Sequence, residues 1–299
     1  MPPPAPTGLV IAAFAAIYLI WGSTYLAIRF AVETMPPFMM GGARFLLAGG
    51  GLYLWLRTRG APNPTPAQWS NALIVGSLLL GIGNGGVNWA EQTVPSSLVA
   101  LLIAVTPLWF ALLDWLRPGG TRPKRSTAVG LVIGFGGMIL LVGPMGDLEQ
   151  ARIRPAGLVA LLAASIAWAS GSLYARYTPK PSIPMMGGAL QMLAGGVALC
   201  LTGLIMGEAA DFSIHRVSGR SLGAFAYLTL VGSLVGFTAY SWLLKVSTPA
   251  RVSTYAYVNP VIALFLGCAW GGERLTMRDW TAAAVILLGV VIINTRPSR

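Results

Sequence analysis

The sequence predicts an all-α membrane protein whose ten transmembrane helices form two inverted five-helix repeats around a central cavity. Of the 299 residues, 55% are hydrophobic and only 10% are charged, which excludes most soluble folds. Apolar runs of the ~20 residues needed to cross a bilayer recur along the whole chain. One twelve-residue stretch also occurs twice, as MMGGARFLLAGG from Met39 and as MMGGALQMLAGG from Met185.

Each apolar run predicts one helix. The ten predicted helices cover 8-29, 38-57, 68-91, 96-116, 126-143, 155-176, 185-206, 220-245, 250-270 and 278-295. The connections between them are short, so function is expected to reside in helices within lipid. No enzyme activity is predicted, since the hydrolase-like motif GRSLG around Ser221 precedes a membrane helix instead of following a strand.

The duplication divides the chain into a first repeat, 1-150, and a second repeat, 151-299. WGSTYLAIRF from Trp21 is echoed by WASGSLYARY from Trp168 in the same register. Because five is odd, the second repeat enters the bilayer with the opposite orientation to the first. Inverted repeats are typical of alternating access, and the repeated glycines predict either close helix packing or a sliding surface.

Charge predicts the sidedness of the chain. With the N-terminus inside, the cytoplasmic ends of the helices carry twelve Lys and Arg residues and the outer ends carry seven. Acidic residues show the opposite bias, with Asp114 alone inside. Both termini are therefore expected in the cytoplasm, which also accounts for the net charge of +11 without nucleic-acid binding.

These features resemble the EamA family of the drug/metabolite transporter superfamily. The resemblance rests on WGSTYLAIRF, ARFLLAG, the VTP and VNP helices, and GERLTMRDWTAAAVILLGVVII near the end, while the first repeat has RPGGT without a glutamate at the corresponding place. The chain is similar to YddG-type amino-acid exporters. This resemblance implies a central cavity and efflux of amino acids, including aromatic ones, and related metabolites across a bacterial inner membrane.

The third predicted helix has a polar face. Gly81, Asn84, Asn88 and Glu91 recur at helical spacing in GIGNGGVNWAEQ, and two amides are not expected to face lipid. They either bond to neighbouring helices or line a cavity. The same segment matches the glycine spacing of a dinucleotide site, but no strand precedes it, so no such cofactor is predicted.

Aromatic residues and one arginine complete the candidate site. Arg44 is the only basic residue well inside a predicted span, so it either binds a substrate carboxylate or pairs with Glu91 or helix carbonyls. Pro107 and Pro260 are predicted hinges, with plain bending as the alternative. The predicted cavity residues, for which ordinary packing is the alternative, are Trp21, Ser23, Tyr25, Asn84, Asn88, Trp89, Trp168 and Tyr257.

The expected partners are a small-molecule substrate and membrane lipid, with no cofactor, metal, nucleic acid or obligate protein partner. Cys200 and Cys268 lie in predicted spans and are expected to be packing residues. Glu91 is expected to stay ionised by water at a helix end, which favours facilitated flux over proton coupling. The alternatives are a drug or nucleotide-sugar-like carrier and, from a different class, a receptor or assembly subunit.

Overall fold

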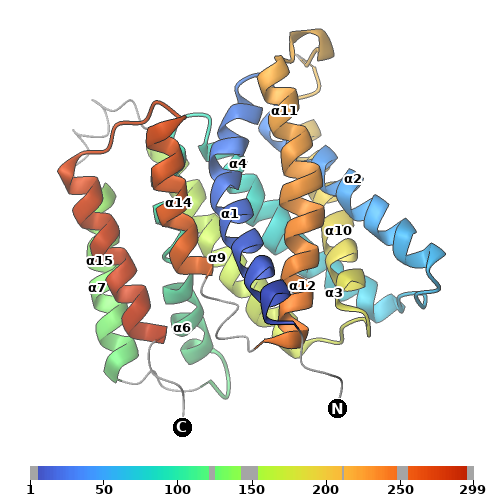
Figure 1. Cartoon of the computed structure of the whole chain (residues 1–299), viewed down its shortest axis with the longest axis horizontal. Coiled ribbons are helices and arrows are strands. Elements are labelled where there is room, and N and C mark those ends of the chain that lie inside the picture. The colour runs from blue at the N-terminus through green and yellow to red at the C-terminus, as the bar shows by residue number, and fades with distance from the viewer. Residues whose placement is uncertain (1–5, 121–124, 143–153, 211, 248–254, 295–299) are drawn as a thin grey trace.

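The computed structural model describes residues 6–120, 125–142, 154–210, 212–247 and 255–294, with only the backbone for a few of them, including Tyr257. All regular structure within these ranges is helical (Figure 1). The elements are α1 (Thr7–Val32), α2 (Pro37–Thr58), α3 (Pro66–Gly76), η1 (Ser77–Asn84), α4 (Gly85–Ala90), α5 (Ser96–Ile103), α6 (Thr106–Leu116), α7 (Arg125–Val142), α9 (Pro155–Tyr177), α10 (Pro184–Ile205), η2 (Ile214–Arg216), α11 (Gly219–Tyr227), η3 (Leu228–Val235), α12 (Gly236–Val246), α14 (Tyr255–Ala269) and α15 (Met277–Asn294).

Every predicted span contains a described helix. Six helical segments are long and apolar enough to cross a membrane, and Arg125–Leu140 and Val258–Ala269 are shorter apolar helices. The six are Thr7–Val32, Pro66–Ala90, Ser96–Leu116, Pro155–Tyr177, Pro184–Ile205 and Gly219–Tyr240. The all-helical membrane architecture is therefore confirmed, and the crossing of the bilayer by all ten segments stays a prediction.

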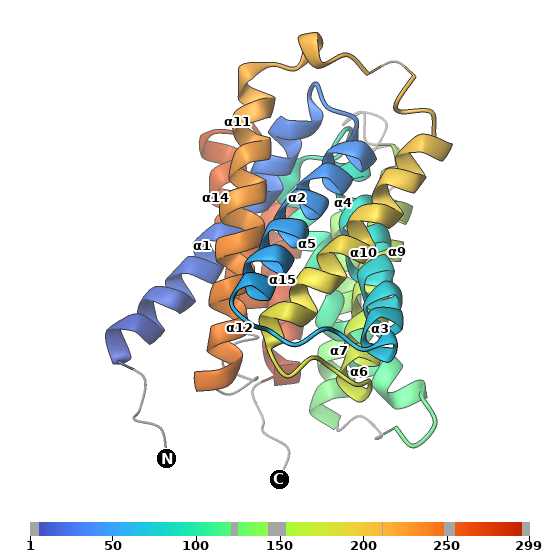
Figure 2. The same cartoon turned by 90° about the vertical axis from the view of Figure 1, so that its right-hand side faces the viewer.

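Two ends of the bundle can be distinguished. Arg29, near the end of α1, pairs with Glu273 in the connection between α14 and α15, and we call this the Glu273 end. The start of α1 and the end of α15 lie together at the opposite end, the terminal end (Figures 1 and 2). Gly157 in the first turn of α9 lies against Val94, next to the serines that bind Glu273. Helices α1 and α9 therefore run in opposite directions.

The repeated glycines lie where α2 packs against α10. A Cβ on Gly196 would come within 3.1 Å of the Gly42 carbonyl oxygen, and one on Gly49 within 3.0 Å of the Ala189 oxygen. The order of these contacts makes the two helices antiparallel, as Figure 2 shows. Small residues permit this close approach of two backbones, so the predicted packing role of the repeat is confirmed.

A second antiparallel contact joins α7 to α15. A Cβ on Gly289 would lie 2.6 Å from the Gly134 nitrogen, and one on Gly137 would lie 2.9 Å from the Ile286 nitrogen. Each of these contacts brings together the same helix of the two predicted repeats. Figure 1 shows this pair at the side of the bundle away from α2.

Two π-helical segments interrupt helices at corresponding places in the two repeats. Both η1 and η3 have eight residues, and each continues directly from and into α-helix. Segment η1 packs against α9 and α10, and η3 packs against α1 and α2. π-Helical turns are rare and often mark functional sites. The sequence pattern did not reveal either segment.

Candidate functional site

Trp21, from the middle of α1, lies in an aromatic cluster. Its ring centroid is 5.9 Å from that of Phe237, 5.2 Å from that of Tyr240 and 5.0 Å from that of Tyr255, and we call these four residues the Trp21 cluster. The indole nitrogen donates to the carbonyl oxygen of Gly232 in η3 at 3.3 Å. A predicted cavity residue of the first repeat is thus held against the π-helical segment of the second.

Arg44 approaches the same segment from α2. Its Nε donates to the Ser233 hydroxyl at 3.0 Å, and its guanidinium lies 4.7 Å from the centre of the Phe45 ring. The residue is 4% exposed, and Nη1 has no hydrogen-bond partner among the described residues. A Cβ on Gly232 would lie 3.4 Å from both Arg44 Nη2 and Thr24 Cγ2. Arg44 and Trp21 therefore meet at Gly232.

The predicted pairing of Arg44 with Glu91 is wrong. No ion pair within the described ranges includes Arg44, whose Nε is bound by Ser233 of η3. Glu91 instead lies close enough to Arg29 of α1 to interact with its charge. The two side chains leave their helices toward different neighbours, which sequence spacing alone does not reveal.

Two other predicted residues of α1 lie in different surroundings. The Ser23 hydroxyl is 2.6 Å from the Tyr227 hydroxyl of α11, so it lies on the side of α1 that faces the second repeat. Tyr25 packs against the apolar core formed with α5 and α14. The side chain of Tyr257 lies outside the described residues.

The remaining predicted residues gather around η1. Trp168 on α9 lies at Gly83, where a Cβ would come 3.0 Å from ring atom Cε3, much as Trp21 lies at Gly236, where a Cβ would come 2.5 Å from Nε1. Asn88 is fully buried, and its Nδ2 donates to the Pro37 carbonyl of α2 at 3.3 Å, while Oδ1 has no partner within the described ranges. Asn84 is partly buried. The π-helical turn interrupts the 3.6-residue period from which a single polar face was predicted.

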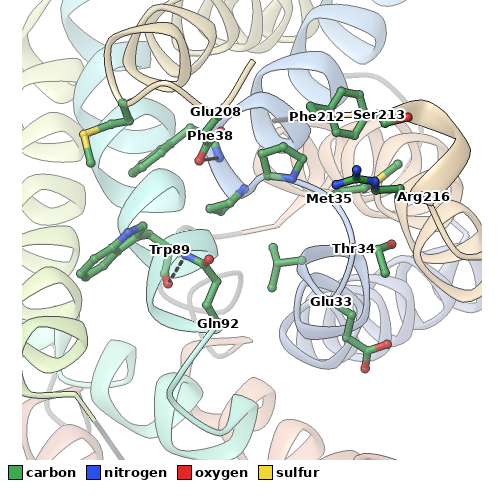
Figure 3. Close-up of a pocket in the computed structure, with 14 residues that line it drawn as sticks. Glu33, Thr34, Met35, Phe38, Trp89, Gln92, Glu208, Phe212, Ser213 and Arg216 are labelled. Atoms are coloured by element: carbon green, nitrogen blue, oxygen red, sulfur yellow. Dashed lines mark hydrogen bonds between the residues drawn. The ribbon is translucent and has the colours of Figure 1, made fainter. Parts of the chain in front are cut away.

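A pocket of about 460 Å³ lies at the Glu273 end, beside the start of α2 (Figure 3). We call it the Phe38 pocket. Phe38, Trp89 and Phe212 provide apolar walls, and Arg216 provides a cation. The Glu208 carboxylate in its wall accepts hydrogen bonds from the backbone nitrogens of Phe38 at 3.2 Å and Met39 at 2.8 Å. Of the predicted cavity residues, Trp89 alone lines this pocket.

Polar contacts join the two repeats at the same end. Glu273 Oε1 accepts from Arg29 Nη1 at 2.6 Å and from the Ser96 nitrogen and hydroxyl at 2.7 Å each, and Oε2 accepts from the Ser97 nitrogen at 3.0 Å and from its hydroxyl. We call these four residues the Glu273 network. Burial by itself raises the pKa of Glu273, but the hydrogen bonds from Ser97 and Ser96 outweigh it, so the pKa lies below its usual value. Glu273 is therefore held ionised.

Glu91, in the turn between α4 and α5, is buried, so the prediction that water surrounds it is wrong. It is 4% exposed, and neither carboxylate oxygen has a hydrogen-bond partner among the described residues. The next residue, Gln92, is exposed, but the Glu91 side chain points into the core, to which the chain returns at Val94, which is 1% exposed.

The two predicted hinges differ. Pro260 lies inside α14, as expected. The span Ser96–Leu116 breaks at Ala104 and Val105, between α5 and α6, and Pro107 lies in the first turn of α6, so a hinge at either proline stays a prediction. The Ile103 carbonyl, which cannot bond to the nitrogen of Pro107, accepts a hydrogen bond from Thr106 Oγ1 at 2.6 Å.

Antiparallel apolar helices form the bundle of this membrane protein. Between them lie polar side chains, namely Arg44, Asn84, Asn88, Glu91 and Glu273. The EamA-like transporter family model matches residues 7–143 and 155–295, so the chain belongs to this family. The protein is therefore a membrane transporter. The family model matches twice, once in each half of the chain, so the chain contains two repeats.

Individual relatives agree with the family. The chain is 41% identical over 283 residues, 94% of its length and 89% of the other, to YedA of Escherichia coli K12, described as an uncharacterized inner membrane transporter. It is 26% identical over 281 residues to protein PecM of Dickeya dadantii, covering 92% of this chain and 89% of that one. A crystal structure with 20% identity aligns with a TM-score of 0.63 over 97% of this chain and 98% of that one, which shows a shared fold.

Proposed function

We propose that the protein exports amino acids, including aromatic ones, and related metabolites across a bacterial inner membrane by alternating access. All ten helical segments span the membrane in this proposal, as two inverted five-helix halves, 1-150 and 151-299. The opposite directions of α1 and α9, the antiparallel pairs α2–α10 and α7–α15, and the corresponding positions of η1 and η3 support it. Helices related in this way can exchange packings and expose a central site to each side in turn.

Arg44 carries the proposed substrate chemistry. Arg44 is 4% exposed, and its Nη1 has no hydrogen-bond partner among the described residues, so its guanidinium is suited to bind a carboxylate through charge-assisted hydrogen bonds. The Trp21 cluster lies on the other side of Gly232 and provides aromatic surface for an apolar or aromatic side chain. One buried cation beside aromatic walls favours a small carboxylate with an apolar body.

The Glu273 network closes the site at one end in this proposal. Glu273 belongs to the second half, while Arg29, Ser96 and Ser97 belong to the first, so opening that end requires these contacts to break. The corresponding connection of the first half, RPGGT, has no glutamate. A pocket of about 530 Å³ between α6 and α9 lies at the terminal end, where Leu113 and Tyr174 line it.

A transport assay in proteoliposomes tests the proposal. Efflux of a panel of amino acids is measured against amines of the same shape without the carboxylate, such as phenylalanine against phenethylamine. Phenylalanine should be transported and phenethylamine should not. In Arg44→Gln the apparent affinity for phenylalanine should fall about 10- to 100-fold, because a hydrogen bond to a charged group contributes about 1.5–3 kcal/mol.

The matched control is Arg220→Gln, which removes an exposed arginine at the Glu273 end and should leave the affinity unchanged. Equal transport of phenylalanine and phenethylamine, or unchanged affinity in folded Arg44→Gln, would overturn the proposed role of Arg44. Adding cationic drugs and nucleotide sugars to the panel distinguishes amino-acid export from the alternative, a drug or nucleotide-sugar-like carrier.

A further inference from the structure

Glu91 is a buried carboxylic acid that the proposed substrate site does not use. It is 4% exposed, and neither of its oxygens accepts a hydrogen bond from the described residues. Glu273, in contrast, receives donors from Ser96, Ser97 and Arg29. Of these two carboxylates at the same end of the bundle, Glu273 has hydrogen-bond partners and Glu91 has none among the described residues.

The groups around Glu91 would not balance a negative charge on it in addition to that of Glu273. From α1, Arg29 and the Tyr25 hydroxyl are near enough to interact with it, and Glu273 does so from the α14–α15 connection. Helices α2 and α9, which also lie beside α4, contribute apolar side chains to the surrounding core, among them Met40 and Leu158. Among the described residues, Arg29 is therefore the one cation whose charge reaches Glu91.

Arg29 is already bound to the other carboxylate. Its Nη1 lies 2.6 Å from Glu273 Oε1, so the charges of Arg29 and Glu273 cancel within that pair. Among the described residues, an ionised Glu91 would be a buried charge with no side-chain donor and no counter-ion of its own, which is an unfavourable arrangement. A protonated Glu91 avoids this cost.

We propose that Glu91 is a proton-binding site that is occupied in this conformation and releases its proton to water when the Glu273 network opens. Opening admits water to the α4–α5 turn and separates Arg29 from Glu273, so that Arg29 is free to pair with the new Glu91 carboxylate. The O–H bond of the Glu91 carboxyl breaks, its electron pair stays on the oxygen, and the proton passes to solvent. Protonation therefore stabilises closure of the Glu273 end, and each opening is linked to loss of one proton.

The test measures opening directly and uses no substrate, so its result does not depend on which solute is transported. Spin labels at Gln92 and Arg274, both exposed and next to the network, report the distance between the α4–α5 turn and the α14–α15 connection. The labelled full-length protein, with Cys200 and Cys268 replaced by serine, is reconstituted in lipid. The distance distribution is then recorded from about pH 5 to about pH 9, the range in which a buried carboxyl group is expected to titrate.

The closed population should fall as pH rises, following a one-proton titration. Glu91→Gln keeps the neutral form at every pH and should stay closed across the range, while Glu33→Gln, which alters a carboxylate 40% exposed at the same end, should titrate as the parent does. A parent distribution that is independent of pH would overturn the proposal without any variant. A folded Glu91→Gln that titrates like the parent would overturn it as well.

Discussion

At the scale of the residue, neighbours decide what each polar side chain can do. Arg29 and Arg44 are both arginines on membrane helices, but Arg29 pairs with the Glu273 carboxylate, whereas Arg44 contacts only the Ser233 hydroxyl and the Phe45 ring among the described residues. A guanidinium whose charge is already balanced is a structural group, and one whose charge is not balanced can bind an anion. Glu91 and Glu273 differ in the same way, since only Glu273 has donors.

Trp21→Ala should reduce transport strongly, because it removes the residue that holds Gly232 of η3 and contacts three other rings. Loss of a large packed side chain also costs about 3–5 kcal/mol of stability, so transport is measured per folded molecule. The control Trp55→Ala removes an indole that is 49% exposed and should have little effect. Equal transport by the two folded variants would contradict a role for Trp21 in the site.

Glu273→Gln should destabilise the protein by about 1.5–3 kcal/mol near neutral pH, since it removes the charge from several hydrogen bonds. The pKa of Glu273 is lowered in the folded protein, so its contribution is present above the unfolded pKa and is lost as pH falls through the folded one. Thermal melts of both proteins from about pH 4 to pH 8 span this change. Their difference should shrink toward the acid side, and a difference that grows there would refute the assignment.

At the scale of the element, small residues determine how closely helices approach. Gly49 and Gly51 lie two residues apart on α2, but only Gly49 faces α10. A Cβ on Gly49 would lie 2.8 Å from Met192 Cβ, whereas nothing lies within 4 Å of one on Gly51. The repeated sequence therefore includes contact positions and positions that point away.

Gly49→Ala should lower stability by about 1–3 kcal/mol, because the added methyl group meets backbone and Cβ atoms that cannot move independently. Gly51→Ala should be neutral or slightly stabilising, since alanine favours helix and the space is open. Thermal unfolding in lipid nanodiscs compares the two. Equal midpoints would show that α2 and α10 can separate at no cost.

At the scale of the whole molecule, the two ends of the bundle differ in their contacts. Gly119 follows α6 at the terminal end, and Ser213 lies between α10 and α11 beside the Phe38 pocket at the Glu273 end. Charge predicts that the first lies in the cytoplasm and the second outside the cell. The structure places them at opposite ends, which that prediction requires.

Single cysteines at Gly119 and Ser213, with Cys200 and Cys268 replaced by serine, test the orientation in intact cells. An impermeant maleimide should label the cysteine at Ser213 from outside and should label the one at Gly119 only after the membrane is broken. The reverse pattern would place both termini outside and would make the Glu273 end cytoplasmic.

The sequence by itself determined the helices, the family and the repeat. The length and hydropathy of each apolar run are local properties of the sequence. The duplicated segments that begin at Met39 and Met185 can be aligned by sequence alone, so the repeat is visible without coordinates. Trp21, Ser23 and Arg44 could also be singled out, because polar and aromatic residues inside an apolar helix need an explanation. The convergence of Trp21 and Arg44 on η3, with Ser23 beside Tyr227 of α11, was not predictable, since it depends on how α1 and α2 pack against the second repeat.

Only the tertiary structure decided which polar groups have partners. The π-helical turns shift the faces of two helices, so that Asn88 bonds to α2 and the polar face predicted from a 3.6-residue period is not continuous. Arg44 lies beside Ser233 and not Glu91, and Glu91 is buried where water was expected. Whether a group is solvated or paired depends on residues far away in the chain. Sequence therefore singled out Arg44 as a charge inside the bundle, whereas packing decided its partner and the burial of Glu91.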